Sequence, residues 1–198
     1  MTEKRELKAY FTETFVRVYQ AYNHIIAESA IKFQKFLSPP FKMDRFTWIK
    51  PSFFWMMYRC DWGQRRDQER ILAVDIRHEG FLWALEHGCL SHFDQDYYAS
   101  VSEWQNTKLS SPVILQWDPE RDINSNKTAQ RTIQIGLSPY ASKLYNEEWI
   151  VKISDLTSLA FEVKTLRDHG HLSEAEALLP KEKCYQISDL VRGKIGLP

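Results

Sequence analysis

Residues 71–76 (ILAVDI) constrain the fold of this chain more than any other segment. They form a short and nearly continuous apolar run, which is typical of a strand buried on both faces. Such a strand needs neighbouring elements on either side. A chain of 198 residues can supply them within one domain that buries a sizeable core. The sequence therefore predicts one globular domain built around an interior strand.

Further strands and helices are expected on both sides of this segment. Alternating and apolar runs predict strands at residues 15–21, 47–49, 113–117, 131–137 and 149–153. Capping residues and prolines predict helices from Asn23 to Pro39, Pro51 to Cys60, residues 79–90, Ser138 to Tyr145, and from Leu156 onward in two pieces divided by Gly170 and Pro180. Residues 94–111 and 122–130 are expected to be polar loops, the first with a short helix. Residues 118–121 (DPER) are expected to be the turn that ends a strand.

This order of elements favours an α+β fold over a doubly wound parallel fold, because several strands pair after short gaps. We expect a single domain with a central mixed, mostly antiparallel sheet flanked by helices. Residues 1–155 would form the α+β core domain. Residues 156–198 would form a C-terminal helical extension packed on it.

Composition and missing motifs narrow the function. The 26 basic and 26 acidic residues cancel, so net charge points to neither nucleic acid nor membrane. The three cysteines lie far apart without a C-x-x-C pair, which argues against a metal site or a disulfide framework. We find no signal peptide, no apolar run of about 18 residues and no motif of dinucleotide-binding, P-loop or hydrolase folds. We expect a soluble cytoplasmic protein without a membrane partner.

Residues 41–62 (FKMDRFTWIKPSFFWMMYRCDW) combine eight aromatic rings with four basic residues. One interpretation is a buried aromatic cluster whose cations reach outward to solvent. The other is the wall of a ligand pocket, because polar and charged residues alternate with the rings. In that case Thr47, Lys50, Ser52 and Tyr58 would face the ligand. Rings beside cations suit a nucleotide cofactor and single-stranded nucleic acid equally well.

Two further groups of polar residues are candidates for the site. Glu120 and Arg121 lie in the expected turn, where they form either a salt-bridged turn or the mouth of a pocket. Arg131 and Gln134 lie on opposite faces of the strand at residues 131–137. The amide of Gln134 would meet either water or a ligand, since it can both donate and accept hydrogen bonds.

The chain resembles domain-of-unknown-function family 4291 over nearly its whole length. The similar runs are VYQAYNHIIAESA, TWIKPSFFWMMYR, QERILAVDI, LQWDPER, RTIQIGL and WIVKISDLT. More loosely, a strand followed by a helix, and a second strand that enters a Met- and Tyr-containing helix, are similar to ADP-ribosyltransferases. This second resemblance implies an ADP-ribosyltransferase-like fold with NAD as the cofactor.

The ADP-ribosyltransferase resemblance also implies roles for particular residues. Tyr19, Gln20, Tyr22, Thr47, Lys50, Ser52 and Tyr58 would bind the cofactor, and Glu120, Arg131 and Gln134 would lie nearest the reacting bond. The chain departs from those enzymes at their catalytic glutamate, because the strand at residues 131–137 carries Gln134 and no glutamate. Glu120 is the nearest carboxylate in sequence, so either it takes that role or the fold is used without the standard chemistry.

Three hypotheses for the function remain open from the sequence. The leading one is an enzyme that binds NAD and transfers ADP-ribose to a nucleic-acid or protein acceptor. The second is a non-enzymatic module that binds RNA or single-stranded DNA through the same rings. The third is a protein-interaction domain in which the aromatic residues belong only to the core.

Overall fold

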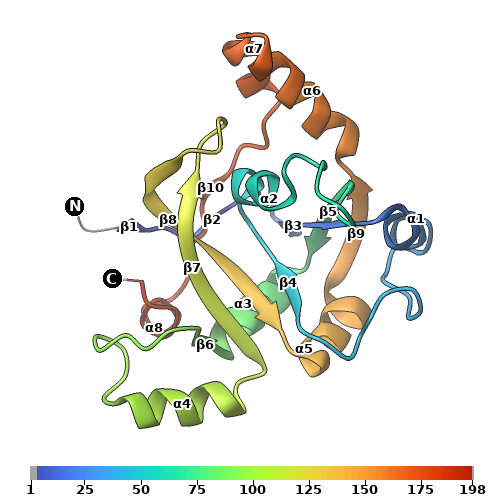
Figure 1. Ribbon diagram of the computed structural model, residues 1–198. Helices are drawn as coiled ribbons and strands as arrows, with labels where there is room; N and C mark the ends of the chain where they lie inside the picture. The colour runs from blue at the N-terminus through green and yellow to red at the C-terminus, as the bar shows by residue number, and fades with distance from the viewer. Residues whose placement is uncertain (1–3, 198) are drawn as a thin grey trace.

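Two main β-sheets, a two-stranded sheet and the helices around them make up the fold, which the computed structural model describes for residues 4–197 (Figure 1). The strands are β1 (Lys4–Arg5), β2 (Lys8–Ala9), β3 (Val16–Tyr22), β4 (Thr47–Ile49), β5 (Arg70–Ile76), β6 (Gly88–Leu90), β7 (Val113–Arg121), β8 (Lys127–Leu137), β9 (Ile150–Asp155) and β10 (Lys183–Cys184). The helices are α1 (His24–Phe33), α2 (Phe53–Cys60), α3 (His78–Glu86), α4 (Val101–Ser110), α5 (Pro139–Leu144), the π-helix η1 (Tyr145–Trp149), α6 (Thr157–Asp168), α7 (Leu172–Ala177) and α8 (Asp189–Lys194).

The larger sheet has the order β1-β8-β7-β6, and β4 pairs with the second half of β8. The smaller sheet has the order β3-β5-β9, and β2 pairs separately with β10. The pairs β1–β8 and β6–β7 are parallel, whereas the other pairs are antiparallel. The expected α+β fold with a mixed, mostly antiparallel sheet and flanking helices is confirmed.

A backbone bridge joins the smaller sheet to the residue that follows β4 of the larger sheet. The backbone N–H of Tyr19 in β3 donates to the carbonyl oxygen of Lys50, directly after β4, at 2.7 Å. Strands β3, β4 and β8, which are far apart in the sequence, therefore lie side by side. Helix α2 follows β4 at once and packs against β3 and β7.

Strand β5 is buried on both faces, as its apolar run predicts. All six residues from Ile71 to Ile76 are buried, and β5 has β3 on one side and β9 on the other. Its buried side chains contribute alternately to two apolar clusters. Leu72 and Val74 belong to the larger cluster, and Ile71 and Ala73 belong to a smaller cluster beside α2 and α6.

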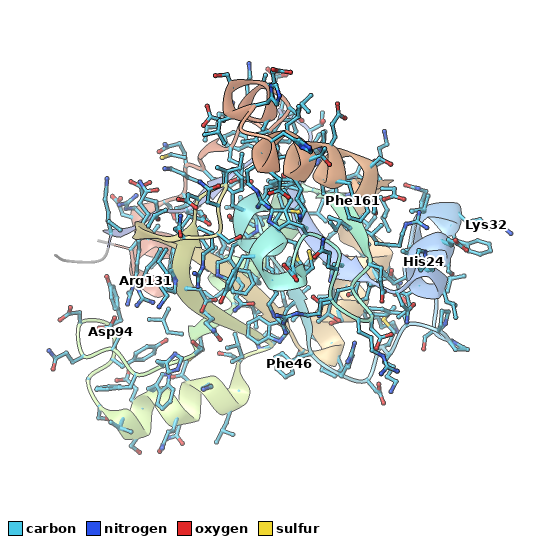
Figure 2. All side chains as sticks on the ribbon, turned by 45° about the horizontal axis from the view of Figure 1, so that its top comes forward. His24, Lys32, Phe46, Asp94, Arg131 and Phe161 are labelled. Carbon is cyan, nitrogen blue, oxygen red and sulfur yellow. The ribbon has the colours of Figure 1, made fainter. Side chains whose placement is uncertain are left out.

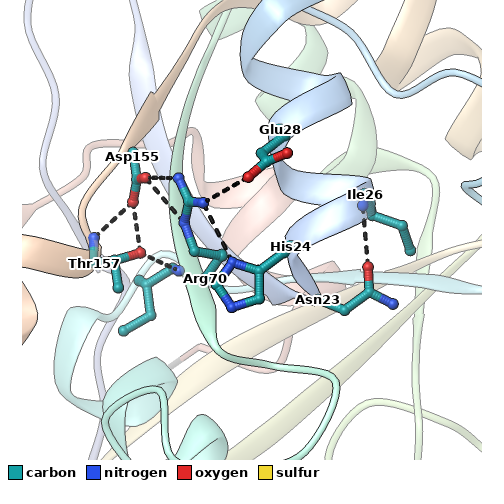
Figure 3. A network of polar contacts seen from close by, with 8 residues as sticks. Asn23, His24, Ile26, Glu28, Arg70, Asp155 and Thr157 are labelled. Atoms are coloured by element: carbon teal, nitrogen blue, oxygen red, sulfur yellow. Dashed lines mark hydrogen bonds and ion pairs between the residues drawn. The ribbon is translucent and has the colours of Figure 1, made fainter.

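A polar network fixes the start of β5 between α1 and the end of β9 (Figure 3). The Nε of Arg70 donates to a carboxylate oxygen of Asp155 at 3.1 Å, and Arg70 also lies 3.5 Å from the carboxylate of Glu28. Asp155 accepts the backbone N–H of Thr157 at 2.8 Å, which ties the first residue of α6 to the same point. Asn23 caps α1 by accepting the N–H of Ile26, as its residue type predicts.

The predicted turn at residues 118–121 is wrong, and the loop at residues 122–130 is shorter than expected. Strand β7 continues through Pro119 to Arg121, and β8 begins at Lys127. A register shift between Pro119 and Arg121 accommodates the proline, as bulges do in antiparallel pairs. The hairpin turn lies around Asp122, whose side chain accepts the N–H groups of Asn124 and Asn126. Glu120 is therefore a strand residue.

Other predicted boundaries also need correction. Helix α1 ends before Gln34, which adopts a left-handed conformation (φ 55°) and has its side chain bound to the backbone of Ile153 in β9. The helix expected at residues 79–90 ends at Glu86, because the next residues pair with β7 as β6. The short helix expected within residues 94–111 is present as α4, which has ten residues. Among the helices of residues 4–197, none is long and apolar enough to cross a membrane.

Candidate functional site

The first turn of α2 is tied to β7 through Ser52. The Ser52 hydroxyl accepts the backbone N–H of Trp55 at 3.1 Å and donates to Oε1 of Glu120 at 2.9 Å. A serine before the first helical residue is a favourable cap because it satisfies a free N–H group. Ser52 is only 1% exposed, so the cap and the carboxylate form one buried unit.

Glu120 is the carboxylate at the centre of the site. Its Oε1 also accepts the backbone N–H of Arg121 at 2.8 Å, and the Thr132 hydroxyl of β8 donates to the same side chain. Burial raises the pKa of Glu120 above its ordinary value, although these three hydrogen bonds oppose that effect. The result is a carboxyl group held in one orientation and less acidic than a free glutamate.

A second carboxyl group, that of Glu182, reaches the same place from the far end of the chain. Its Oε1 accepts the backbone N–H of Phe53, the first residue of α2, at 2.7 Å. Burial raises the pKa of Glu182 to about 8, and the negative charge of Glu120 adds to this effect. Glu182 is not among the residues that the sequence predicts for the site, because a charged stretch after Pro180 carries no local sign of burial.

Polar side chains of β7 and β8 continue the site along the larger sheet. Asp118 accepts hydrogen bonds from Gln134 Nε2 at 2.5 Å and from Gln116 Nε2 at 2.9 Å. Gln116 lies opposite Gln134, and Asp118 lies opposite Thr132. All four side chains therefore project from one face of the sheet. Alternation in β7 could have revealed Gln116 and Asp118 had residues 118–121 not been interpreted as a turn.

Lys50 lies beside this row of polar residues and is nearly excluded from water, with 7% exposure. Its Nζ lies 3.4 Å from the carbonyl oxygen of Trp48 and 5.7 Å from the ring centroid of Trp55. Burial lowers the pKa of Lys50 to about 7, and the positive charge of Arg59 lowers it further, while Asp118 acts in the opposite direction. Lys50 thus offers an amine that exchanges protons near neutral pH.

Tyr58, on the outer side of α2, carries a stacked cation. The guanidinium carbon of Arg121 lies 3.7 Å from the ring centroid, and Tyr58 itself is 41% exposed. Arg121 and Tyr58 therefore form a cation–π pair at the rim of the site. Most other rings of residues 41–62 are buried, among them Phe53, Trp55 and Trp62.

Three predicted cofactor residues belong to the core and not to the polar row of the sheet. Gln20 is buried, accepts the Tyr145 hydroxyl at 2.8 Å and donates to the Tyr22 hydroxyl at 2.8 Å. Its amide also donates to the carbonyl oxygen of Trp48 at 3.3 Å, the same oxygen that Lys50 Nζ contacts. The ring of Tyr22 packs edge-on against Phe36 and Phe41, and burial raises its pKa. Thr47 shares the core-facing side of β4 with Ile49. Gln20, Tyr22 and Thr47 are parts of the core in this structure.

The two remaining predicted residues, Tyr19 and Arg131, take different places. The ring of Tyr19 is fully buried against Phe53, and its hydroxyl has no hydrogen-bond partner. Arg131 lies on the opposite face of β8 from Gln134 and donates to the carbonyl oxygen of Trp117 at 2.8 Å. The structure therefore does not place Arg131 beside Gln134.

A groove of about 930 Å³ runs along the edge of β7 and reaches the site at Asp118. Arg131 and Asp94 line it and lie on the same side of the molecule (Figure 2). Arg5 lines it as well and forms an ion pair with Asp94 at 2.8 Å. The groove is lined by Gln116 and Asp118 of the polar row and by both basic and acidic side chains from other segments.

Within residues 4–197, no three His, Cys, Asp or Glu side chains gather in a way that could hold a metal ion. Comparison with protein families matches residues 6–185 to the family described as Domain of unknown function (DUF4291). No curated protein matches the chain. The match includes Ser52, Glu120, Gln134 and Glu182 but not Arg5 of the groove, and it confirms the first of the two resemblances.

Proposed function

We propose that this chain, which belongs to the DUF4291 family, is an ADP-ribosyltransferase-like enzyme that binds NAD and transfers ADP-ribose to an acceptor. The site would lie between α2 and the face of the larger sheet that carries Glu120 and Gln134. We further propose a cytoplasmic location, consistent with three free cysteines.

The hydrogen bond between Ser52 and Glu120 carries this proposal. The resemblance to ADP-ribosyltransferases rests on a strand entering a helix at residues 47–58, and it needs a carboxylate nearby. The 2.9 Å bond supplies that carboxylate from a strand 68 residues further along the chain. Strand β4 pairs with β8, and the residue after β4 is bridged to β3. This arrangement adds support, because the resemblance implies cofactor-binding or catalytic residues on all three strands.

The residues of the site suit the chemistry of ADP-ribose transfer. The bond between the ribose carbon and the nicotinamide nitrogen breaks, and its electron pair stays on the nicotinamide. The acceptor atom forms a new bond to that carbon and loses a proton. Glu120 can stabilise the positive charge that develops on the ribose and can take this proton. Asp118 holds the amide of Gln134 in a fixed orientation, which favours precise binding of the ligand.

The space next to the site suits a dinucleotide better than the site itself does. Lys50 and Gln134 are 7% and 9% exposed, so the inner face accepts only a small group such as a nicotinamide ring. The groove of about 930 Å³ falls in the range of small-molecule sites. Arg5 and Arg131 line its wall, and a pyrophosphate would bind Arg5 in place of Asp94.

Incubation with NAD labelled in its adenylate part, together with protein or single-stranded nucleic acid, tests the proposal. We expect label on the acceptor and free nicotinamide from the wild type, and a loss of at least tenfold in Glu120→Gln and Gln134→Ala. Glu162→Gln, an exposed glutamate of α6, is the matched control. Absence of both transfer and nicotinamide release would overturn the enzyme proposal, and transfer at an equal rate in all variants would overturn the site.

The second candidate is a non-enzymatic module that binds single-stranded nucleic acid. The pair of the exposed Tyr58 and the half-buried Arg121 favours it, because a ring with a stacked cation can bind a base beside a phosphate. Burial of most other rings in residues 41–62 leaves little surface for further bases. Binding of oligonucleotides that weakens steeply with salt and is insensitive to NAD would favour this candidate.

A further inference from the structure

Arg5 and Arg131 lie side by side at the wall of the groove. They are partners in the parallel pairing of β1 with β8, and both line the groove. Like charges on neighbouring strands repel each other, so an anion with more than one negative charge relieves this repulsion best. Guanidinium groups also match the geometry of phosphate oxygens. The two arginines therefore favour a phosphate or diphosphate group.

Arg5 is held in place by contacts that do not depend on a ligand. Its Nη1 donates to the carbonyl oxygen of Gly196 at 2.8 Å, and its guanidinium carbon lies 5.8 Å from the ring centroid of Tyr97. A side chain at position 196 would disturb this arrangement, because a Cβ there would lie 2.4 Å from Nη1. The guanidinium is therefore preorganised, which lowers the entropic cost of binding an anion.

The anion that Arg5 binds in this structure belongs to the chain itself. Oδ2 of Asp94 lies 2.8 Å from Nη2 of Arg5, and Asp94 lines the groove as well (Figure 2). The other carboxylate oxygen, Oδ1, accepts the backbone N–H of Asp96 at 3.2 Å. The side chains of Arg5 and Asp94 are 26% and 22% exposed, so a ligand in the groove can reach the ion pair.

We propose that Asp94 is an internal competitor, which occupies the phosphate subsite beside Arg5 and lowers the affinity of the groove for anionic ligands. This inference rests on the proposed function, which places NAD in the same groove, and it adds the residue that sets the affinity. A diphosphate binds when the Asp94 side chain turns away from Arg5. Asp94 also makes the groove selective, because a weakly charged ligand gains too little from Arg5 to displace it.

Displacement of Asp94 would change the hydrogen bonds of residues 91–98 in a particular way. The backbone N–H groups of Tyr97 and Tyr98 bind the carbonyl oxygen of Asp94, so the turn stays closed when the side chain leaves. The N–H of Asp96 instead loses its acceptor, Oδ1 of Asp94. A bound ligand ordinarily protects the amides of the folded protein from exchange, whereas this one amide would exchange faster.

Calorimetric titration with inorganic pyrophosphate at about 50 mM salt, where charge pairs are weakly screened, tests the inference. We expect Asp94→Asn to bind about two- to fivefold tighter than the wild type, which is the contribution of a partly exposed ion pair. Asparagine keeps an oxygen that can accept the N–H of Asp96. An ion pair with only a structural role would leave the affinity of this variant equal or weaker.

Two further variants complete the titration. Asp96→Asn, the matched control, removes a negative charge from the same loop and the same groove but leaves the ion pair of Asp94 intact. It should change the affinity by less than about twofold. Arg5→Gln should weaken binding by about tenfold or more, with a thermal melt to verify that it is folded. Hydrogen exchange followed by NMR should show faster exchange of the Asp96 amide when pyrophosphate binds to the wild type.

Four results would overturn the inference: no binding of pyrophosphate to the wild type and Asp94→Asn alike, equal or weaker binding to Asp94→Asn, equal tightening in Asp96→Asn, or slower exchange of the Asp96 amide. The proposed function is tested separately by nicotinamide release from NAD. Tighter pyrophosphate binding to Asp94→Asn without nicotinamide release from any protein overturns only the proposed function. Nicotinamide release with an unchanged pyrophosphate affinity in Asp94→Asn overturns only the role of Asp94.

Discussion

Replacing Glu182 by glutamine should make the protein more stable at alkaline pH and leave it unchanged at acidic pH. The folded protein raises the pKa of Glu182 from its ordinary 4.5 to about 8 by burial and by the charge of Glu120. Below about pH 4.5 the side chain is protonated in both the folded and the unfolded chain, so it has no effect. As pH rises through this window, only the unfolded chain loses the proton, and stability falls.

The size of the effect follows from the pKa. A rise from 4.5 to about 8 corresponds to about 5 kcal/mol of destabilisation once both states are ionised. Glu182 keeps partial contact with solvent, which reduces this to about 2–3 kcal/mol. For a chain of this length the Glu182→Gln variant should melt roughly 4–10 °C higher at about pH 9. Glutamine keeps an oxygen that can accept the N–H of Phe53.

Thermal melts of wild type and variant from about pH 4 to pH 9 measure this directly. The two proteins should melt together at the acidic end and diverge as pH rises, while Glu162→Gln follows the wild type throughout. Parallel curves for wild type and Glu182→Gln would refute the reasoning, because they would show that Glu182 titrates alike in the folded and unfolded chains.

Three further variants test other parts of the structure. Ser52→Ala removes the helix cap and the hydrogen bond to Glu120, and should lower the free energy of unfolding in urea by about 2 kcal/mol. Gly80→Ala places a carbon 2.3 Å from an indole ring and should cost about 3 kcal/mol. The control Gly193→Ala, whose new carbon meets nothing within 4 Å, should be neutral or stabilising by up to about 1 kcal/mol. In Gln34→Asn, asparagine tolerates the left-handed backbone, but its side chain is too short to cover the edge of β9. The free energy of unfolding should fall by about 1–2 kcal/mol, and the variant should associate with increasing concentration in sedimentation experiments. An unchanged free energy of unfolding in Ser52→Ala would contradict the contacts described for the helix cap. Equal stability of the two glycine variants would contradict the contact described for Gly80.

The ring-rich segment at residues 41–62 shows how far local pattern reaches. Phe53 and Met57 are buried in the core beside α2, whereas Lys50 and Ser52 lie on the side of the site. The sequence indicated both kinds of residue, because core and site positions alternate along one strand and one helix. The sequence could not show that Thr47 lies in the core and Lys50 at the site. The face of β4 that meets the core is set by the packing of β8 and β3.

The sequence by itself determined the elements whose signals are local. The apolar run of β5, the strand β4 and the caps at Asn23 and Ser138 follow from periodicity and from side chains that bond their own backbone. Family membership is also a property of the sequence. These features need no partner from a distant part of the chain, so a short window contains all the information they require.

Only the tertiary structure decided the composition of the site. Pro119 predicts a turn locally, yet pairing with β8 keeps Glu120 in a strand, because ladder hydrogen bonds over the rest of the hairpin outweigh one proline. Glu182 meets the first turn of α2 across 129 residues of chain. Its burial, its pKa and its closeness to Glu120 arise from that contact alone, and no local pattern encodes a contact between segments so far apart.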